Sequence, residues 1–229
     1  MSELDPVQRL RLTFSEGETV KYIAHLALMR TWERIFRRAD LPIAYSQGFN
    51  PRPRLTFASA LSVGVIGRAE VMDIELRQPI APEELLRRLK PQLSPDFVVR
   101  SVQEVPLRGP ALQAQVRYAV YVVRLRTERT MSAIQERLEG LLAAGQLLRE
   151  REVKGRQRRY DLRPLVHDLW YAGYADGCHL IGMILVNNNT AAGRPDEVLN
   201  QLGLADERHG TERVRLLFAD DPVERGVVT

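Results

Sequence analysis

The sequence predicts an α+β protein made of two tandem ferredoxin-like units, each with the element order βαββαβ and an antiparallel sheet. Segments of alternating apolar residues, typical of half-buried strands, are interspersed with segments whose apolar residues recur at helical spacing. The order strand, helix, strand, strand, helix, strand occurs twice, on either side of a proline-bounded linker at 106–110. We therefore expect units at 1–105 and 111–218 and a flexible tail at 219–229.

Each element of the first unit has its own signal. Residues 8–14 alternate between apolar and polar side chains, as a half-buried strand does. From 25 to 39 the apolar residues form one helical stripe. Pro82 begins the second helix, and the helix dipole favours the two glutamates of its first turn. The expected strands are 8–14, 55–60, 68–77 and 97–105, and the expected helices are 25–39 and 82–90.

The second unit repeats this order of elements without evident sequence identity to the first. The expected strands are 116–125, 147–153, 178–186 and 212–218, and the expected helices are 130–142 and 194–202. The segment 154–176 is longer than a turn between two strands needs to be. We therefore interpret it as an insertion, and its first residues are basic.

The composition is that of a globular protein, with 229 residues of which 45% are apolar. No apolar run reaches the roughly 18 residues of a membrane span, and residues 1–8 lack the pattern of a signal peptide. The single cysteine, Cys178, excludes a disulfide within this chain and makes a thiolate metal cluster improbable. These features lead us to expect a cytoplasmic protein.

The basic residues are unevenly distributed and are nearly all arginine. Only three of the 33 basic residues are lysine, and the net charge is +4. Residues 149–163 carry seven basic and three acidic residues, whereas residues 196–225 carry four basic and eight acidic ones. The arginine bias can reflect a GC-rich or thermophilic source. It also suits recognition of phosphates and bases, because the guanidinium group is planar and forked.

The segment 45–57 combines turn-forming residues with arginines and aromatic residues. Asn50 and Arg52 each precede a proline and are pushed toward extended backbone, and Gly48 is expected at positive φ. The result is a stiff loop of the kind that often holds binding residues. Its aromatic residues could instead fill the core, and both interpretations can be true together.

The insertion interleaves basic and aromatic residues, a combination that proteins use to bind single-stranded nucleic acid. The alternative is a covering segment in which Trp170 and Tyr171 pack on the sheet. The loop and the insertion are together expected to form one basic RNA-binding surface. Its predicted residues are Tyr45, Gln47, Phe49, Asn50, Arg52, Arg54, Lys154, Arg156, Arg158, Arg159, Tyr160 and Arg163.

Known catalytic motifs are missing from the sequence. There is no HExxH, phosphate-binding loop, GxGxxG or CxxC pattern, and the four histidines lack metal-ligand spacing. We therefore expect no metal site and no cofactor. The weak catalytic candidates are His25, Tyr45 and Arg54. Asp73 and Glu75 share one strand face, and we favour ion pairs with arginines over metal binding for both.

Six segments resemble the radical-SAM-linked protein family, a bacterial domain. They are YIAHLALMR at 22–30, YSQGFNPRPRL at 45–55, MDIEL at 72–76, KG at 154–155 with DLRPL at 161–165, and RPDEVL at 194–199. The resemblance implies a protein encoded beside, or fused to, a cobalamin-binding radical S-adenosylmethionine enzyme. The chain lacks the three-cysteine cluster motif of that enzyme. It also differs from the usual family pattern at Ala27, where Asp is common, and at Arg52, where His is common.

Three functions remain open at this point. We favour a non-catalytic RNA-binding accessory protein that presents an RNA substrate to a radical-SAM partner. The first alternative is an RNA-processing or RNA-modifying enzyme in its own right. The second alternative is a protein–protein adaptor that makes no contact with nucleic acid.

Overall fold

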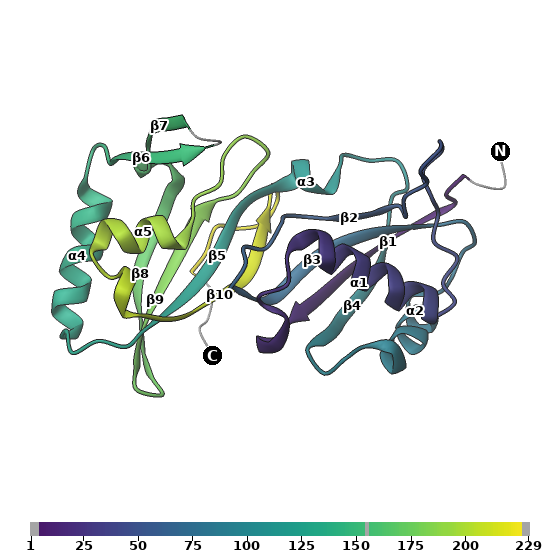
Figure 1. Cartoon of the computed structure of the whole chain (residues 1–229), viewed down its shortest axis with the longest axis horizontal. Helices are drawn as coiled ribbons and strands as arrows, with labels where there is room; N and C mark the ends of the chain where they lie inside the picture. The colour runs from purple at the N-terminus through teal and green to yellow at the C-terminus, as the bar shows by residue number, and fades with distance from the viewer. Residues whose placement is uncertain (1–4, 154–155, 226–229) are drawn as a thin grey trace. The chain divides into compact units, whose positions relative to one another are not determined.

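The computed structural model describes residues 5–153 and 156–225. The chain has a mixed α+β fold with antiparallel strand pairs, and it divides into two compact units, residues 1–115 and 116–229 (Figure 1). Among the described residues, no helix is both long enough and apolar enough to cross a membrane.

The first unit contains a sheet with strand order β4-β1-β3-β2. Two helices follow β1 and β3 in the chain, and a short helix, α3, ends the unit. The elements are β1 (Gln8–Glu16), α1 (His25–Arg38), β2 (Leu55–Phe57), β3 (Ile66–Leu76), α2 (Pro82–Leu89), β4 (Phe97–Val105) and α3 (Leu112–Gln115), with 3-10 turns η1 (Glu18–Val20) and η2 (Lys90–Gln92).

The core of the first unit forms where α1 and α2 pack on the sheet. Trp32 of α1 is completely buried, with its ring centroid 4.8 Å from that of Phe14 and 5.4 Å from those of Phe36 and Phe97. Edge-on and tilted contacts of this kind stabilise a core beyond the burial of area alone. The helical stripe and the alternating strand predicted from the sequence thus meet in one apolar cluster.

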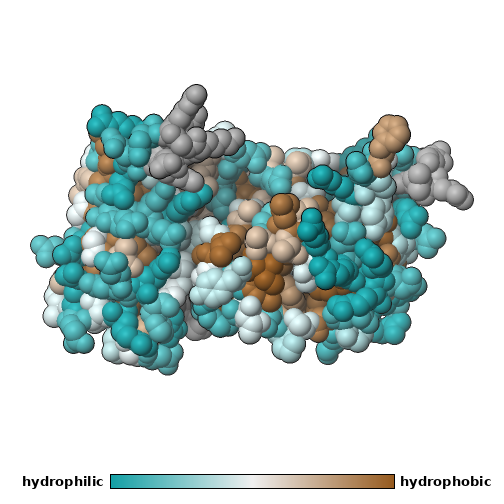
Figure 2. All heavy atoms as spheres, viewed as in Figure 1, coloured by the Kyte–Doolittle hydropathy of each residue, from teal (hydrophilic) through white to brown (hydrophobic). Residues whose placement is uncertain are grey.

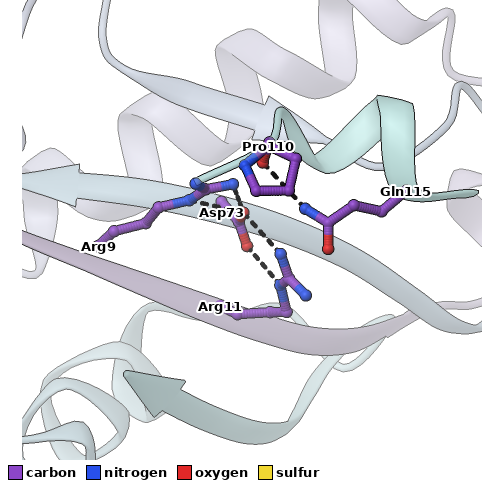
Figure 3. A network of polar contacts seen from close by, with 5 residues as sticks. All are labelled: Arg9, Arg11, Asp73, Pro110 and Gln115. Atoms are coloured by element: carbon purple, nitrogen blue, oxygen red, sulfur yellow. Dashed lines mark hydrogen bonds and ion pairs between the residues drawn. The ribbon is translucent and has the colours of Figure 1, made fainter. Parts of the chain in front are cut away.

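Other side chains of the same sheet form a buried ionic network around Asp73 (Figure 3). The Asp73 carboxylate accepts hydrogen bonds from Nε of Arg9 and Nε of Arg11, each at 2.8 Å. Strand register explains this arrangement, since Arg11 lies directly opposite Asp73 in the β1–β3 ladder and Arg9, two residues before Arg11, shares its face of the sheet. The preference for ion pairs over metal binding is confirmed for both carboxylates, because Asp73 pairs with Arg9 and Arg11 and Glu75 pairs with Arg54.

The second unit contains a sheet with strand order β10-β5-β9-β8 and a separate two-stranded hairpin, β6–β7. Helix α4 packs on β8 and on α5. The elements are β5 (Val116–Leu125), α4 (Met131–Ala143), β6 (Leu148–Val153), β7 (Arg156–Asp161), β8 (Val166–Ala175), β9 (Cys178–Val186), α5 (Pro195–Leu202) and β10 (Arg208–Phe218), with 3-10 turns η3 (Arg163–Leu165) and η4 (Ala205–Glu207).

Local chemistry accounts for the helix ends in this unit. The hydroxyl of Thr130 accepts a hydrogen bond from the Ala133 N–H at the start of α4, as an N-cap residue does. Helix α5 begins with Pro195 and ends at Gly203, which adopts the left-handed conformation at φ +67°. Both helices therefore begin close to the residues that the sequence predicts.

The predicted insertion at 154–176 differs from the structure. The sequence predicts that the strand at 147–153 belongs to the main sheet, but among the described strands β6 pairs with β7 alone. The fourth strand of the sheet is β8, which lies within the supposed insertion. The physical reason is that β6 alternates Arg and Glu and has no apolar face to bury, whereas β8 supplies Val166 and Leu169 to the core. The alternative of a covering segment that packs on the sheet differs from the structure too, because Trp170 and Tyr171 belong to β8, which is itself a strand of the sheet.

The chain after β10 lies against the second unit at least as far as Arg225. The carboxylate of Asp221 accepts a hydrogen bond from the Phe218 N–H at 2.8 Å, and the carbonyl of Glu224 accepts one from Arg215 at 3.1 Å. Arg225 itself pairs with Asp168 of β8. These contacts involve residues 221–225, and the flexibility expected of the tail at 219–229 stays a prediction.

Candidate nucleic-acid interface

The loop between α1 and β2 is closed at its base like a hairpin. Tyr45 and Pro53 form an isolated antiparallel bridge. The Ser46 N–H donates to the Arg52 carbonyl at 2.8 Å, the Arg52 N–H donates to the Ser46 hydroxyl at 3.0 Å, and the Arg54 N–H donates to the Ala44 carbonyl at 2.7 Å. These bonds leave residues 47–51 as the tip, and they hold the tip in a defined position on the first unit.

Gly48 makes this tip possible. Its φ of +123° lies in a region that only glycine occupies readily, and a Cβ added there would meet nothing within 4 Å. Conformation alone, and not crowding, therefore requires glycine at this position, as the sequence predicts.

The aromatic residues of the segment divide between the core and the surface. Phe57 is buried and Tyr45 packs against the core cluster, whereas the ring of Phe49 is fully exposed. Gln47, Asn50 and Arg52 are exposed beside it. The guanidinium group of Arg52 makes no ion pair with any residue in 5–153 or 156–225. The core-filling interpretation thus holds for Phe57 and Tyr45, and a binding role for the exposed residues stays a prediction.

A small pocket opens beside the base of this loop, and the sequence analysis missed it. Its volume is about 200 Å³, and its wall is formed by α1, by Tyr45 and Pro53 of the loop, and by Arg77 after β3. Glu33 and Arg37 of α1, and Asp40 just after α1, contribute charges of both signs. One helical turn away, Arg30 and Arg34 lie exposed on α1. The arginine row on α1 therefore continues the exposed polar surface of the loop within the same unit.

The three catalytic candidates have different partners in the structure. The ring of His25 packs edge-on against Phe57 with centroids 5.2 Å apart. Arg54 Nη1 lies 3.0 Å from the Glu75 carboxylate, and Tyr45 lines the pocket. These contacts provide packing and charge pairing, and a catalytic role for any of the three residues stays a prediction. Among the described residues, no three His, Cys, Asp or Glu side chains gather in a group that could hold a metal ion.

The basic hairpin β6–β7 has an unusual distribution of charge between its two faces. Its antiparallel register places residue 149 opposite 160, 151 opposite 158, and 153 opposite 156. Because alternate residues of a strand share a face, these six positions, four of them arginine, lie on one face of the hairpin. Like charges directly opposite each other destabilise a ladder. The register thus places four arginine positions along one side of the backbone ladder.

The remaining predicted residues of this region have separate positions. Arg159 lies on the other face, exposed, and its Nε donates to Glu150 at 2.7 Å. The guanidinium group of Arg163 donates to the Leu142 carbonyl at 2.9 Å and to the Val166 carbonyl at 2.7 Å, and a role of Arg163 in RNA binding stays a prediction. Arg163 therefore ties the last turn of α4 to β8, as cations near helix C-termini do. Lys154 lies outside the described residues, as do the side chains of Arg156 and Arg158.

The two parts of the predicted RNA-binding surface belong to different units. The loop 45–54 lies in the first unit and the hairpin 148–161 in the second. Their union in a single surface stays a prediction, and each part is a candidate interface by itself.

A family model with the description "Uncharacterized protein conserved in bacteria (DUF2344)" matches residues 9–195. The chain belongs to this family. The DUF2344 match extends from β1 to the start of α5 and includes both the loop and the basic hairpin. The candidate interface thus lies within the part of the chain that defines the family.

The other comparisons add little to this assignment. The comparison with curated proteins gave no match. Among solved structures, a chain of the "Crystal Structure of a Cbf5-Nop10-Gar1 Complex" is similar to the DUF2344 chain with a TM-score of 0.48 and 13% identity. The match covers 93% of this chain and 50% of the solved one, so the protein spans about half the length of that chain. A likeness at this level carries no argument about function.

Proposed function

We propose that this protein is an RNA-binding accessory factor that presents RNA to a radical-SAM partner enzyme. The observation that carries the proposal is the fully exposed ring of Phe49 at the tip of a hydrogen-bonded loop. A phenylalanine that remains in water forgoes about 1.5–3 kcal/mol of burial free energy. An unpaired base that stacks on such a ring contributes about 1–3 kcal/mol, so RNA would recover most of this loss.

The polar residues around Phe49 suit the same ligand. The exposed amides of Gln47 and Asn50 can donate to and accept from base edges, and the free guanidinium group of Arg52 can bind phosphate or a base edge in a forked geometry. In the second unit, the arginine-rich face of the β6–β7 hairpin offers contacts to the RNA backbone. The two stretches together supply stacking, edge recognition and neutralisation of phosphate charge.

The finer description of the fold belongs to the same proposal. The strand orders β4-β1-β3-β2 and β10-β5-β9-β8 are the arrangement expected for a βαββαβ unit once the hairpin β6–β7 is set aside. They support two ferredoxin-like units, at 1–105 and 111–218. The radical-SAM partner rests on the sequence resemblance alone, and an RNA-processing or RNA-modifying enzyme remains the alternative.

A second candidate function, the protein–protein adaptor, has one observation in its favour. Tyr22, Leu26 and Val63 are between 60% and 71% exposed. The Gly64 N–H donates to the Lys21 carbonyl at 2.7 Å, which brings their two segments together. Figure 2 shows apolar side chains gathered near the start of α1. Exposed apolar groups of this kind often mark contacts with other proteins.

The experiment is a fluorescence-anisotropy salt series with single-stranded and structured RNA. If about five arginines contact phosphates, the logarithm of the affinity falls with the logarithm of the salt concentration at a slope of about 0.7 per contact. Charge reversal of Arg156 and Arg158 should weaken binding to all sequences about equally and flatten the slope. Arg52→Ala should instead change which sequences bind, if Arg52 contacts a base edge.

The matched control is Arg87→Glu, on α2, combined with Lys90→Glu, at the residue that directly follows α2. This variant changes the net charge by the same amount, at two exposed positions outside the proposed surface. If both double variants lose affinity equally, the effect comes from overall charge and the assigned surface is wrong. If no RNA binds at about 50 mM salt, where phosphate contacts are strongest, the adaptor replaces the RNA-binding factor as the preferred function.

A further inference from the structure

The indole ring of Trp170 packs in a defined position on the sheet of the second unit. It lies opposite Gly182 in the β8–β9 ladder, and a Cβ added at Gly182 would come within 2.0 Å of the Trp170 indole. The indole therefore lies over the glycine, with one face against strand β9. Trp170 and Tyr118 both pack against the same buried cluster, which contains Val120 and Ile184. A glycine directly beneath a tryptophan creates a flat aromatic platform on a strand.

The other face of this indole is occupied by an arginine from the end of the chain. Cζ of Arg225 lies 5.5 Å from the Trp170 ring centroid. Its Nε and Nη2 donate to the two carboxylate oxygens of Asp168 at 2.6 and 3.1 Å. The site thus holds a planar group over an aromatic ring while a carboxylate accepts two parallel N–H bonds from its edge.

Arg225 is weakly held in this position. Its side chain is 57% exposed and that of Asp168 is 23% exposed. Ion pairs of this exposure contribute little to stability, because water screens them and the long side chain loses freedom. A ligand with the same pattern of donors could therefore displace Arg225 without disturbing the fold.

We propose that Trp170 and Asp168 form a binding site for a guanine base of single-stranded RNA, and that Arg225 occupies this site when RNA is absent. Guanine is the base whose Watson–Crick edge presents two adjacent N–H donors, at N1 and N2, in the same fork as a guanidinium group. Adenine and cytosine offer one amino group on that edge, and uracil offers one N–H between two acceptors. The inference rests on the proposed RNA-binding function and adds a base preference to it.

A neighbouring pair of rings supports the choice of RNA over a protein ligand. Tyr118 and His167 lie with ring centroids 4.8 Å apart, and Tyr118 packs on the same apolar cluster as Trp170. His167 is exposed. Successive bases of a single strand can stack on successive aromatic side chains, so RNA could use all of these rings. An arginine side chain of a partner protein would stack on one ring and leave the others unused.

The chain provides its own spectroscopic probe of this site. It has two tryptophans, of which Trp32 is completely buried, so quenching of fluorescence by a bound base reports on Trp170. The full chain and its Arg225→Ala variant are titrated with the RNA hexamers UUGGUU, UUAAUU and UUIIUU, where I is inosine. Inosine retains N1–H and lacks the N2 amino group.

We expect Arg225→Ala to bind UUGGUU at least about fivefold more tightly than the wild type, with quenching of Trp170. Replacement of guanine by inosine should cost about tenfold in that variant, because one donor to a charged oxygen is lost. Asp168→Asn in the Arg225→Ala background should remove the preference for guanine over adenine while stacking persists. Asparagine retains one acceptor oxygen for the Leu169 N–H that Asp168 now binds at 2.9 Å, so the fold is kept.

Other outcomes overturn the inference. If the hexamers bind in a way that depends on Arg156 and Arg158 but leave Trp170 fluorescence unchanged in both proteins, the RNA-binding function stands and the guanine site is wrong. If acetyl-Gly-Arg-Gly-amide quenches Trp170 in Arg225→Ala and UUGGUU does not, the site takes an arginine of a protein. If no hexamer binds either protein, the proposed function and this inference fail together.

Discussion

The indole of Trp170 lies over Gly182, its register partner on the adjacent strand. This relationship between two residues explains why the nearly continuous apolar strand β9 contains a glycine at its centre. A side chain at position 182 would occupy the same space as the ring. The pair therefore decides both the packing of β8 on β9 and the orientation of the platform that Arg225 covers.

Gly182→Ala should destabilise the protein by about 1–3 kcal/mol, because the added methyl group forces the indole away from β9. The measurement is the free energy of unfolding in denaturant, together with the emission maximum of Trp170. The control is Gly140→Ala, which lies within α4 with nothing near an added Cβ. That change should stabilise the protein by about 0.5–1 kcal/mol. Equal changes in unfolding free energy at the two glycines would contradict the packing of the Trp170 indole over Gly182.

Asp73→Asn should cost about 3–5 kcal/mol of unfolding free energy. Asp73 is 3% exposed and carries the only negative charge of the network in Figure 3, so its removal leaves the largely buried Arg9 without a counter-charge. Glu75→Gln on the same strand is the control. The Arg54–Glu75 pair is partly exposed and should contribute no more than about 1 kcal/mol. A loss at Asp73 as small as that at Glu75 would show that the network is unimportant for stability.

Phe49→Ala should separate binding from stability. The ring is fully exposed, so the unfolding free energy should change by less than about 0.5 kcal/mol. The affinity for single-stranded RNA should fall about fivefold or more, since one stacked base is lost. Phe57→Ala in the same segment should show the opposite pattern, with a loss of about 3–5 kcal/mol in stability because Phe57 is buried. Unchanged RNA affinity in Phe49→Ala would remove the main support for the proposed interface.

Acid should weaken the helix α2 through Glu84. Hydrogen bonds from Arg87, and then from Arg88, lower the pKa of Glu84 from 4.5 to about 2. As the pH falls, the unfolded chain takes up the proton first, so the stabilisation is present above about pH 4.5 and is lost toward pH 2. Denaturant unfolding of wild type and Glu84→Gln between pH 6 and pH 2.5 tests this. The difference in stability between the two proteins should shrink with acidity, and a constant difference would contradict the assignment.

Local periodicity accounts for the parts of the fold that could be predicted. The alternation in β1, the apolar stripe of α1 and the proline at the start of α2 are each visible within about a dozen residues. Strand and helix formation depends mainly on such near neighbours, because one face of each element must be apolar to be buried. The turn chemistry at Gly48 is local in the same sense, and its positive φ was predicted for that reason.

Contacts between residues that are far apart in the sequence could not be predicted from these local patterns. The sequence by itself determined where most elements begin and end and which loop presents arginines to solvent. Only the tertiary structure decided that β6 leaves the main sheet for β7, that Arg163 binds the end of α4, and that Arg225 reaches Trp170. The physical reason is that an alternating segment is compatible with several partners. The choice among them depends on which long-range pairing buries the most apolar surface and leaves the fewest charges without a counter-ion.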